Sequence, residues 1–499
     1  MDAPSGQTEH GAKLTNLQEV LIKAVSSKVV DITSFWNENA ELMKGVFESF
    51  DDFQDFYGKV MGLKNPTFGK RIRIASLQQC EEGKHIWIKG WVKSLRNHGA
   101  IIFVDLMDST GTIQCCLNKE QASGLRMEEG VELGGHISIH RGKSEIQVDQ
   151  IKRINPSQPG ITMQPRSESD PFNGNTVDHL LRNRHLYLRN PKLAAMMKFR
   201  NLLQSEMRSW FSKNDFISFD APILTPVPLY EDDSAIKAGL SKQNVFMTQC
   251  VGYYLEAAAH GLEKVYNMGP SFRGEEGRSK RHLMEYWHIK AEWCWDNFEG
   301  VIGAVEEIIP FLTRQLKAKG GDFLKELGVN LCEDGLKAPY PRITYRECCD
   351  ILAREGFDIE FGKSLGSKEE EFLSHNFFPN HPFWVTGIPR SIEPFPYSID
   401  PQDTEVCMVA DLITSNGCGE LLGVAEKIYD FDMLLERMRE KNRDTDPRYE
   451  FVREVHASGC VPHVAFGMGL ERLMRWLIGN DHVRDCHGFP RIFDRTMNP

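Results

Sequence analysis

Two short segments bring together arginines, carboxylates and an aromatic residue, the residue types that suit work on a phosphate. The first runs Phe272-Arg273-Gly274-Glu275-Glu276 and is followed by Arg281-His282-Leu283-Met284-Glu285-Tyr286. The second, near the C-terminus, is Gly467-Met468-Gly469-Leu470-Glu471-Arg472. Arginine pairs bidentately with phosphate or carboxylate through its planar fork, whereas lysine offers only a point charge. We therefore interpret both segments as parts of a site for a phosphate-bearing substrate.

In order and approximate spacing these segments resemble motifs 2 and 3 of the class II aminoacyl-tRNA synthetases, in the subgroup of the asparaginyl and aspartyl enzymes. The likeness extends from about residue 71 to residue 495. A lone arginine or tyrosine is more often an ion-paired surface group or a core residue, so the interpretation depends on their joint occurrence. The resemblance implies an α+β fold: a class II synthetase antiparallel sheet flanked by helices, preceded by an OB-fold β-barrel and a helical N-terminal extension.

The resemblance implies an ATP-binding role for Arg273, Glu275, Arg281, His282, Leu283, Tyr286, Glu420, Gly469 and Arg472. Of these, Arg273 would hold the α-phosphate and the substrate carboxylate, and Tyr286 and Arg472 would enclose the adenine ring. Glu420 would be the metal ligand, binding ATP-bound Mg²⁺, a hard cation that prefers oxygen. Arg273, Glu420 and Arg472 are the expected catalytic residues. Because an ionised carboxylate attacks the α-phosphorus directly, no general base is required.

The resemblance also implies an amino-acid pocket, formed by Glu231, Gly252, Glu256, Gly423, Lys427 and His456. Glu256 matches the glutamate that reads the side-chain amide in asparaginyl enzymes, but Gly252 stands where a glutamine would hold the substrate ammonium. Lys427 and His456 stand where the family has arginines. Asparagine is the expected amino acid, and these departures leave a related acid open.

Three functions remain open at this point. The first is an asparaginyl-tRNA synthetase-like ligase that adenylates asparagine and transfers it to tRNA. The alternative is a synthetase paralogue that adenylates an amino or other carboxylic acid and forms an amide with ammonia or a small amine in specialised metabolism. The third is a noncatalytic regulatory or RNA-binding protein, which predicts broken ATP motifs.

Composition indicates a multidomain protein, with 499 residues, 41% of them hydrophobic, and a net charge of -11. The acidic total argues against a protein that coats nucleic acid, but it leaves room for specific tRNA contacts. The 12 cysteines include no C-x-x-C pair, so neither a zinc site nor a disulfide framework is indicated, and a cytoplasmic location fits best. No apolar run approaches the roughly 20 residues of a membrane span, so no membrane partner is expected.

Hydrophobic periodicity and turn residues predict four segments. Residues 1–68 have helical spacing and would form the N-terminal extension, and residues 69–155 alternate with period two over five short strands, as expected of a small antiparallel barrel. Residues 156–180 form a linker or hinge, and residues 181–499 the catalytic domain. The helix and proline-ended strand near its start resemble motif 1, which implies a homodimer.

Three positions of the expected barrel match family positions that read anticodon bases. Phe103 would stack on a base, Gln114 would read one through its amide, and Glu145 follows at the third position. The simpler interpretation of Phe103 is ordinary barrel core, because Ile101 and Ile102 beside it are apolar. Strand alternation must therefore expose Phe103 if it is to bind tRNA.

Overall fold

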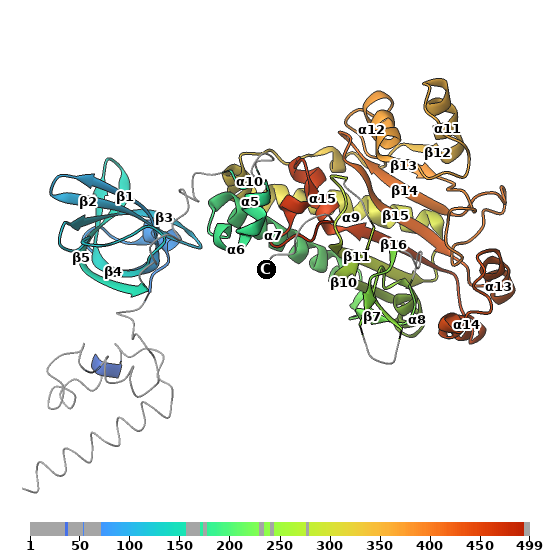
Figure 1. Ribbon diagram of the computed structural model, residues 1–499, viewed down its shortest axis with the longest axis horizontal. Coiled ribbons are helices and arrows are strands. Elements are labelled where there is room, and N and C mark those ends of the chain that lie inside the picture. Colours follow the sequence, from blue (N-terminus) through green and yellow to red (C-terminus); the bar gives the residue numbers. More distant parts are fainter. Residues whose placement is uncertain are drawn as a thin grey trace, which may run out of the picture. The chain divides into compact units, whose positions relative to one another are not determined.

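The computed structural model describes residues 35–37, 53, 71–155, 170–172, 177–228, 234–239, 244–275 and 279–493 (Figure 1). The chain divides into two compact units, residues 1–167 and 168–499. The predicted helical extension lies almost wholly outside the described residues, as does most of the predicted linker. The segment boundaries proposed from the sequence therefore remain predictions.

The first unit contains a closed five-stranded barrel in the order β1-β2-β3-β5-β4, preceded by the short 3-10 helix η1 (Ile74–Gln79). Its strands are β1 (His85–His98), β2 (Ile101–Asp108), β3 (Gly111–Asn118), β4 (Gly130–His140) and β5 (Lys143–Asn155). The predicted OB-type barrel is confirmed. The expectation of purely antiparallel pairing is wrong at one point, because β3 and β5 run parallel where the barrel closes.

Strand alternation builds the barrel core. Val104 and Leu106 of β2 are fully buried, whereas Phe103 and Asp105, which alternate with them, are only partly buried. Successive side chains of a strand point to opposite faces, so Phe103 belongs to the outer face of the barrel. The structure thus meets the condition on which the tRNA interpretation of Phe103 depends.

The second unit is built on an eight-stranded sheet in the order β12-β13-β14-β15-β16-β11-β10-β6. These strands are β6 (Ile217–Ser218), β10 (Lys264–Phe272), β11 (Glu285–Cys294), β12 (Arg342–Thr344), β13 (Phe383–Thr386), β14 (Val409–Thr414), β15 (Gly419–Lys427) and β16 (His463–Gly469). All neighbours are antiparallel except the outermost pairs, β12 with β13 and β10 with β6. A small sheet of β7 (Leu224–Thr225), β9 (Val245–Met247) and β8 (Lys237–Ala238) accompanies it.

Helices flank this sheet, which confirms the predicted α+β architecture. They are α5 (Val177–Arg182), α6 (Arg184–Tyr187), α7 (Pro191–Lys213), α8 (Gly252–Leu262), α9 (Phe298–Lys319), α10 (Gly321–Leu327), α11 (Tyr345–Arg354), α12 (Ser367–Asn376), α13 (Phe431–Glu440), α14 (Glu450–Ala457) and α15 (Leu470–Ile478). Pro191 begins α7 at a position that needs no N–H donor, and Asn190 caps it by accepting from the Lys192 N–H at 3.0 Å.

The main core lies between α7, α9, α15 and the central strands. Phe199 of α7, Ile308 of α9, Phe466 of β16 and Leu473 of α15 belong to one buried apolar cluster. This packing fixes the central strands, whose outer ends carry the candidate site. Within the described part of the chain, no helix has the length and apolar character needed to cross a membrane.

Candidate active site

A cavity of about 310 Å³ opens on the central strands of the large sheet. All of the positions predicted to bind ATP line it, namely Arg273, Glu275, Arg281, His282, Leu283, Tyr286, Glu420, Gly469 and Arg472. They come from the segment between β10 and β11, from β11, from the start of β15, from the end of β16 and from the first turn of α15. Residues up to about 200 positions apart in sequence therefore meet in one place.

The strand register brings these segments together. The hairpin β10-β11 places Ser271 opposite Tyr286, and β11 pairs in turn with β16, His288 lying opposite Gly469. Strand β16 pairs on its other edge with β15, which carries Glu420 at its start. Gly469 ends β16 directly before α15, so Arg472 is held one turn into a buried helix.

Three arginines supply positive charge to the cavity. Arg273 lies with its guanidinium carbon 6.0 Å from the centre of the Tyr286 ring. Arg472 pairs with Glu420, its Nη1 atom 3.2 Å from Oε2, and donates to the backbone carbonyl of Glu420 at 3.0 Å. An arginine fork held in this way can contact phosphate oxygens without reorganising.

Arg281, expected along the β- and γ-phosphates, forms an ion pair with Glu370 of α12, and its Nη2 atom lies 3.2 Å from Glu370 Oε1. The second Glu370 oxygen accepts the Glu420 N–H at 2.9 Å. Burial raises the pKa of Glu370 in spite of the Arg281 charge. Glu370 could not be predicted from the sequence, because no local pattern connects it to an arginine 89 positions away.

Asp411 is a second missed residue. It lies on β14, lines the cavity, and pairs in register with Gly423 of β15. Burial and the neighbouring Glu420 charge raise the pKa of Asp411 well above its usual value. Burial also acts to raise the pKa of Glu420, but Arg472, Arg281 and Arg273 outweigh it and lower that pKa. Two carboxylates on adjacent strands fit the oxygen ligands that Mg²⁺ prefers. The sequence signal for Asp411 is that it and Glu420 lie on two consecutive strands, β14 and β15, which pair as a hairpin.

His282, expected beside the β- and γ-phosphates, lies among these cations. Burial and the charges of Arg472 and Arg281 lower the pKa of His282 to about 4. Its Nδ1 atom is hydrogen-bonded to the Ser279 hydroxyl. His282 is therefore neutral near pH 7. It contributes an uncharged imidazole beside Arg472 and Arg281 rather than a further positive charge.

The floor of the cavity contains a lysine that the sequence analysis did not single out. Lys290 of β11 lines the cavity, and a side chain at the predicted position Gly252 would meet its Nζ atom at 3.0 Å. Burial acts to raise the pKa of the Cys250 thiol, but Lys290 and a hydrogen bond with His288 lower it to about 5. Gly423 of the predicted amino-acid pocket also lines the cavity, whereas Gly252 does not.

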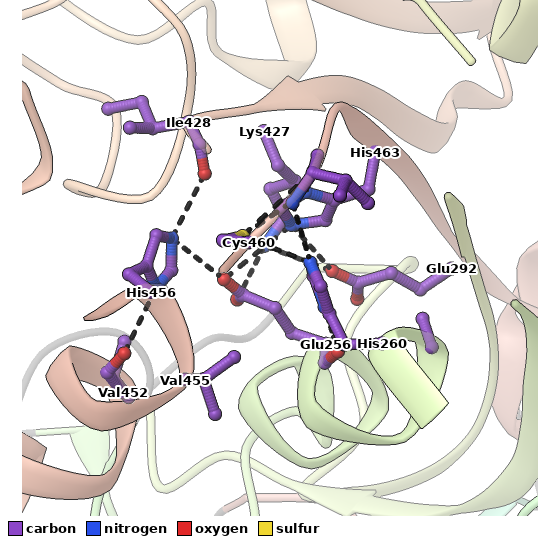
Figure 2. A network of polar contacts seen from close by, with 12 residues as sticks. Glu256, His260, Glu292, Lys427, Ile428, Val452, Val455, His456, Cys460 and His463 are labelled. Atoms are coloured by element: carbon purple, nitrogen blue, oxygen red, sulfur yellow. Dashed lines mark hydrogen bonds and ion pairs between the residues drawn. The ribbon is translucent and has the colours of Figure 1, made fainter. Parts of the chain in front are cut away.

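Glu256, Lys427 and His456 meet in a buried network beside the cavity rather than on its wall (Figure 2). Lys427 Nζ lies 3.6 Å from Glu256 Oε2, and His456 Nε2 lies 3.2 Å from Glu256 Oε1. Burial acts to raise the pKa of Glu256, but Lys427 and the histidines lower it well below its usual range. The structure thus brings these three predicted residues into contact with one another, and none of them lines the cavity. Glu231 lies outside the described residues.

The barrel carries the three predicted anticodon residues on one face. Gln114 and Glu145 are paired in register on β3 and β5, and Gln114 Nε2 donates to Glu145 Oε2 at 2.9 Å. Arg96 of β1 donates to Gln114 Oε1 at 3.0 Å. Phe103 packs edge-on against His98, with ring centres 5.5 Å apart. The result is an aromatic ring beside a row of amide, carboxylate and guanidinium groups, the kind of surface that reads unstacked bases.

Known protein families account for both units. The family described as tRNA synthetases class II (D, K and N) matches residues 176–492, well over half of the chain. This chain belongs to the class II tRNA synthetases. It is accordingly an ATP-dependent ligase. The family described as OB-fold nucleic acid binding domain matches residues 86–154, in agreement with the barrel.

Similar class II synthetases span nearly the same length. The asparagine-tRNA ligase of Thermococcus gammatolerans is 32% identical over 439 residues, which make up 85% of this chain and 99% of that protein. The asparaginyl-tRNA synthetase of Pyrococcus horikoshii complexed with asparaginyl-adenylate has a TM-score of 0.79 at 30% identity, over 86% of this chain and 100% of that one. The Entamoeba histolytica asparaginyl-tRNA synthetase in complex with asparaginyl-adenylate has a TM-score of 0.75 at 25% identity.

Proposed function

We propose that this synthetase adenylates asparagine with ATP and transfers it to tRNA. The observation that carries the proposal is the single cavity in which Arg273, Arg472, Tyr286 and Glu420 converge, in a chain that is similar to asparagine-tRNA ligases over almost their whole length. This likeness does not favour the amide-forming alternative.

The proposed reaction begins with attack of the asparagine carboxylate on the α-phosphorus of ATP, which releases pyrophosphate. Arg273 would contact both the carboxylate and the α-phosphate, because it lies against the Tyr286 ring on which adenine would stack. Its contribution is to orient the two anions and to neutralise the charge that builds on the phosphate oxygens. Arg472 would close the other side of the nucleotide, held in place by Glu420.

Glu420 and Asp411 are the residues that would hold Mg²⁺, which would neutralise phosphate charge and help to orient the pyrophosphate leaving group. Both carboxylates face the cavity among three arginines. Burial and the charges of Glu420, Glu393 and Glu370 raise the pKa of Asp411, so this part of the cavity is rich in carboxylates.

The direct test is to incubate the purified chain with ATP, Mg²⁺, asparagine and tRNA, and to analyse the tRNA 3′ end by mass spectrometry. The proposal expects asparaginyl-tRNA and one AMP for each acylated end. Omission of tRNA should leave adenylate formation and stop the second step. AMP release with amide formation on added ammonia, and no acylated tRNA, would instead identify the amide-forming alternative and overturn the tRNA assignment.

We further propose that the protein acts as a homodimer through the motif 1 region, which comprises α7 and the strands β6 and β7 that follow it. Support comes from the resemblance of this region to the dimer-forming motif of the family. Light scattering during gel filtration should give twice the 57.0 kDa of one chain. A mass of one chain across micromolar concentrations would refute the dimer.

A further inference from the structure

One row of residues, which runs across four strands of the large sheet, forms part of the cavity floor. Lys290 of β11 lies opposite Gly467 of β16. Gly467 in turn lies opposite Gly423 of β15, which lies opposite Asp411 of β14. All four residues line the cavity. Directly opposite residues of neighbouring strands share one face of a sheet. The row therefore has a cation at one end, a carboxylate at the other, and only glycines between them.

The two glycines keep the middle of this row open. A Cβ atom at Gly467 would lie 2.8 Å from His288 Nε2, and one at Gly423 would lie 3.0 Å from Asp411 Oδ1. Both distances are shorter than the contacts that carbon atoms normally make. A ligand on this part of the floor can therefore approach the backbone closely and reach the end of the row that carries Lys290.

Lys290 is a buried cation at the edge of the cavity. Its side chain and backbone together are only 4% exposed. Gly467 and Ala465 of the neighbouring strand β16, which also line the cavity, carry no charge. An ammonium group has three donors and no acceptor, and it repels a second ammonium. The ligand group that contacts Lys290 should therefore be an acceptor oxygen.

The Cys250 thiol lies behind Lys290, outside the cavity wall. A Cβ atom at Gly252 would lie 3.0 Å from Lys290 Nζ and 3.8 Å from Cys250 Sγ, so both groups border one point at the start of α8. Burial acts to raise the pKa of Cys250, but Lys290 and a hydrogen bond with His288 lower it to about 5. The resulting thiolate balances the charge of Lys290, which suits a neutral acceptor oxygen in front of the lysine.

The distance along β11 fits the length of the proposed reactants. Tyr286, His288 and Lys290 are alternate residues of this strand, and all three line the cavity. Because a strand rises about 3.3 Å per residue, Lys290 lies about 13 Å beyond Tyr286, against which adenine would stack. The phosphates and the reacting carboxylate would lie near Arg273, which contacts Tyr286. The acid would therefore reach Lys290 with the end opposite its carboxylate.

We propose that Lys290 determines which acid is activated, by donating a hydrogen bond to the side-chain carbonyl oxygen of asparagine. The inference rests on the proposed function, since it assigns a partner to the substrate of the same site. Lys290 is then a specificity-determining residue, and Cys250 is a positioning residue that acts through it. The acids that fit carry an acceptor oxygen on the fourth carbon. An acid with an apolar side chain removes the acceptor from a buried donor, which is costly.

The experiment compares asparagine with 2-aminobutyrate, which has the same four-carbon chain without the amide. Pyrophosphate exchange is measured over a range of each acid, with the full wild-type chain and with Lys290→Met. The substitution should raise the KM for asparagine about 10- to 100-fold, as expected for the loss of a hydrogen bond from a charged donor. The KM for ATP should stay unchanged, and the KM for 2-aminobutyrate should not rise. The preference for asparagine over 2-aminobutyrate should therefore fall.

Lys264→Met is the control, because it removes a lysine of the adjacent strand β10 that does not line the cavity. Circular dichroism establishes that each variant is folded, and if Lys290→Met is not, Lys290→Gln carries the test. The proposal is overturned if the KM for asparagine stays at the wild-type value. It is equally overturned if exchange falls by the same factor with both acids, as the loss of a purely structural residue would cause.

The same assay distinguishes this proposal from the proposed function. If the wild-type chain exchanges with aspartate and not with asparagine, the proposed substrate is wrong. Lys290→Met should then raise the KM for aspartate, which carries oxygens at the same position, and an unchanged KM would overturn the role of Lys290. Exchange with 2-aminobutyrate alone, or with none of the three acids, overturns both proposals.

Discussion

Arg273 is the residue on which the proposed chemistry depends most. It lines the cavity against the Tyr286 ring, at the end of the hairpin β10-β11, and no other described cation occupies that position. Arg472 and Arg281 are paired with Glu420 and Glu370, which lie on other elements of the sheet and its helices, whereas Arg273 is paired with Glu275, two residues along its own loop. Loss of Arg273 should therefore be felt in the transition state rather than in the fold.

Arg273→Ala should lower asparagine-dependent pyrophosphate exchange about 100- to 1,000-fold, the usual effect of removing one donor to developing charge. Arg273→Lys should recover only part of this, because an ammonium cannot contact carboxylate and phosphate bidentately. The control is Arg314→Ala, which removes an exposed arginine from α9. Full exchange activity in Arg273→Ala would mean that the segment has been misassigned.

His282 predicts a dependence of stability on pH. Its pKa is about 4 in the folded chain and near the usual 6.5 when unfolded. As the pH falls through 6.5, the unfolded state takes up a proton that the folded state does not, so the free energy of unfolding decreases. This loss should continue until the pH approaches 4.

Thermal unfolding of the nucleotide-free chain, measured from about pH 7 to about pH 5, should therefore show a shallower decline for His282→Gln than for wild type. The exposed His140 provides the control, because its replacement by glutamine should leave the wild-type slope. Equal slopes for all three proteins would contradict the cause given for the low pKa.

At the scale of elements, the barrel and the sheet should have separable roles. Phe103→Ala should reduce tRNA charging by about 5- to 150-fold, the equivalent of 1 to 3 kcal/mol of base stacking. Adenylate formation should be unchanged, because Phe103 belongs to the other compact unit. Ile139→Ala is the control, since it truncates another exposed apolar side chain of the barrel. If Phe103→Ala charges tRNA as well as wild type does, the face of the barrel that carries Phe103 does not bind tRNA.

The elements that could be predicted from the sequence are those whose residues are close together in the chain. The alternating strands of the barrel, helix α7 behind its proline, and the arginines of the two motif-like segments could all be predicted from local pattern and resemblance. Contacts that depend on the pairing of strands were not predicted. Asp411 joins the cavity through the pairing of β14 with β15, and His260 meets Cys460 across 200 positions. The parallel pairing of β3 with β5, which closes the barrel, was not predicted either, because it too joins strands that are not consecutive in the chain.

The amino-acid end of the cavity shows the same limit more sharply. Residue matching placed Glu256, Lys427 and His456 in the amino-acid pocket, and in the structure their charged groups contact one another beside the cavity, so their role in binding the amino acid stays a prediction. Lys290, which does line the cavity, was not noticed. Burial and pairing of charge depend on tertiary packing, which a match of positions does not contain.

At the scale of the whole molecule, two compact units predict two partly independent activities. A chain beginning at residue 168 should fold, retain pyrophosphate exchange with asparagine, and lose most tRNA charging. The comparison is the full chain assayed at the same concentration, with circular dichroism to establish folding. If the folded fragment charges tRNA as well as the full chain, the barrel does not contribute to tRNA binding.

The most direct test of the central claim is pyrophosphate exchange into ATP, measured with Mg²⁺ and each standard amino acid in turn. The account predicts strong stimulation by asparagine, dependent on Arg273. Wild-type protein that binds ATP but exchanges pyrophosphate with none of the amino acids would contradict it.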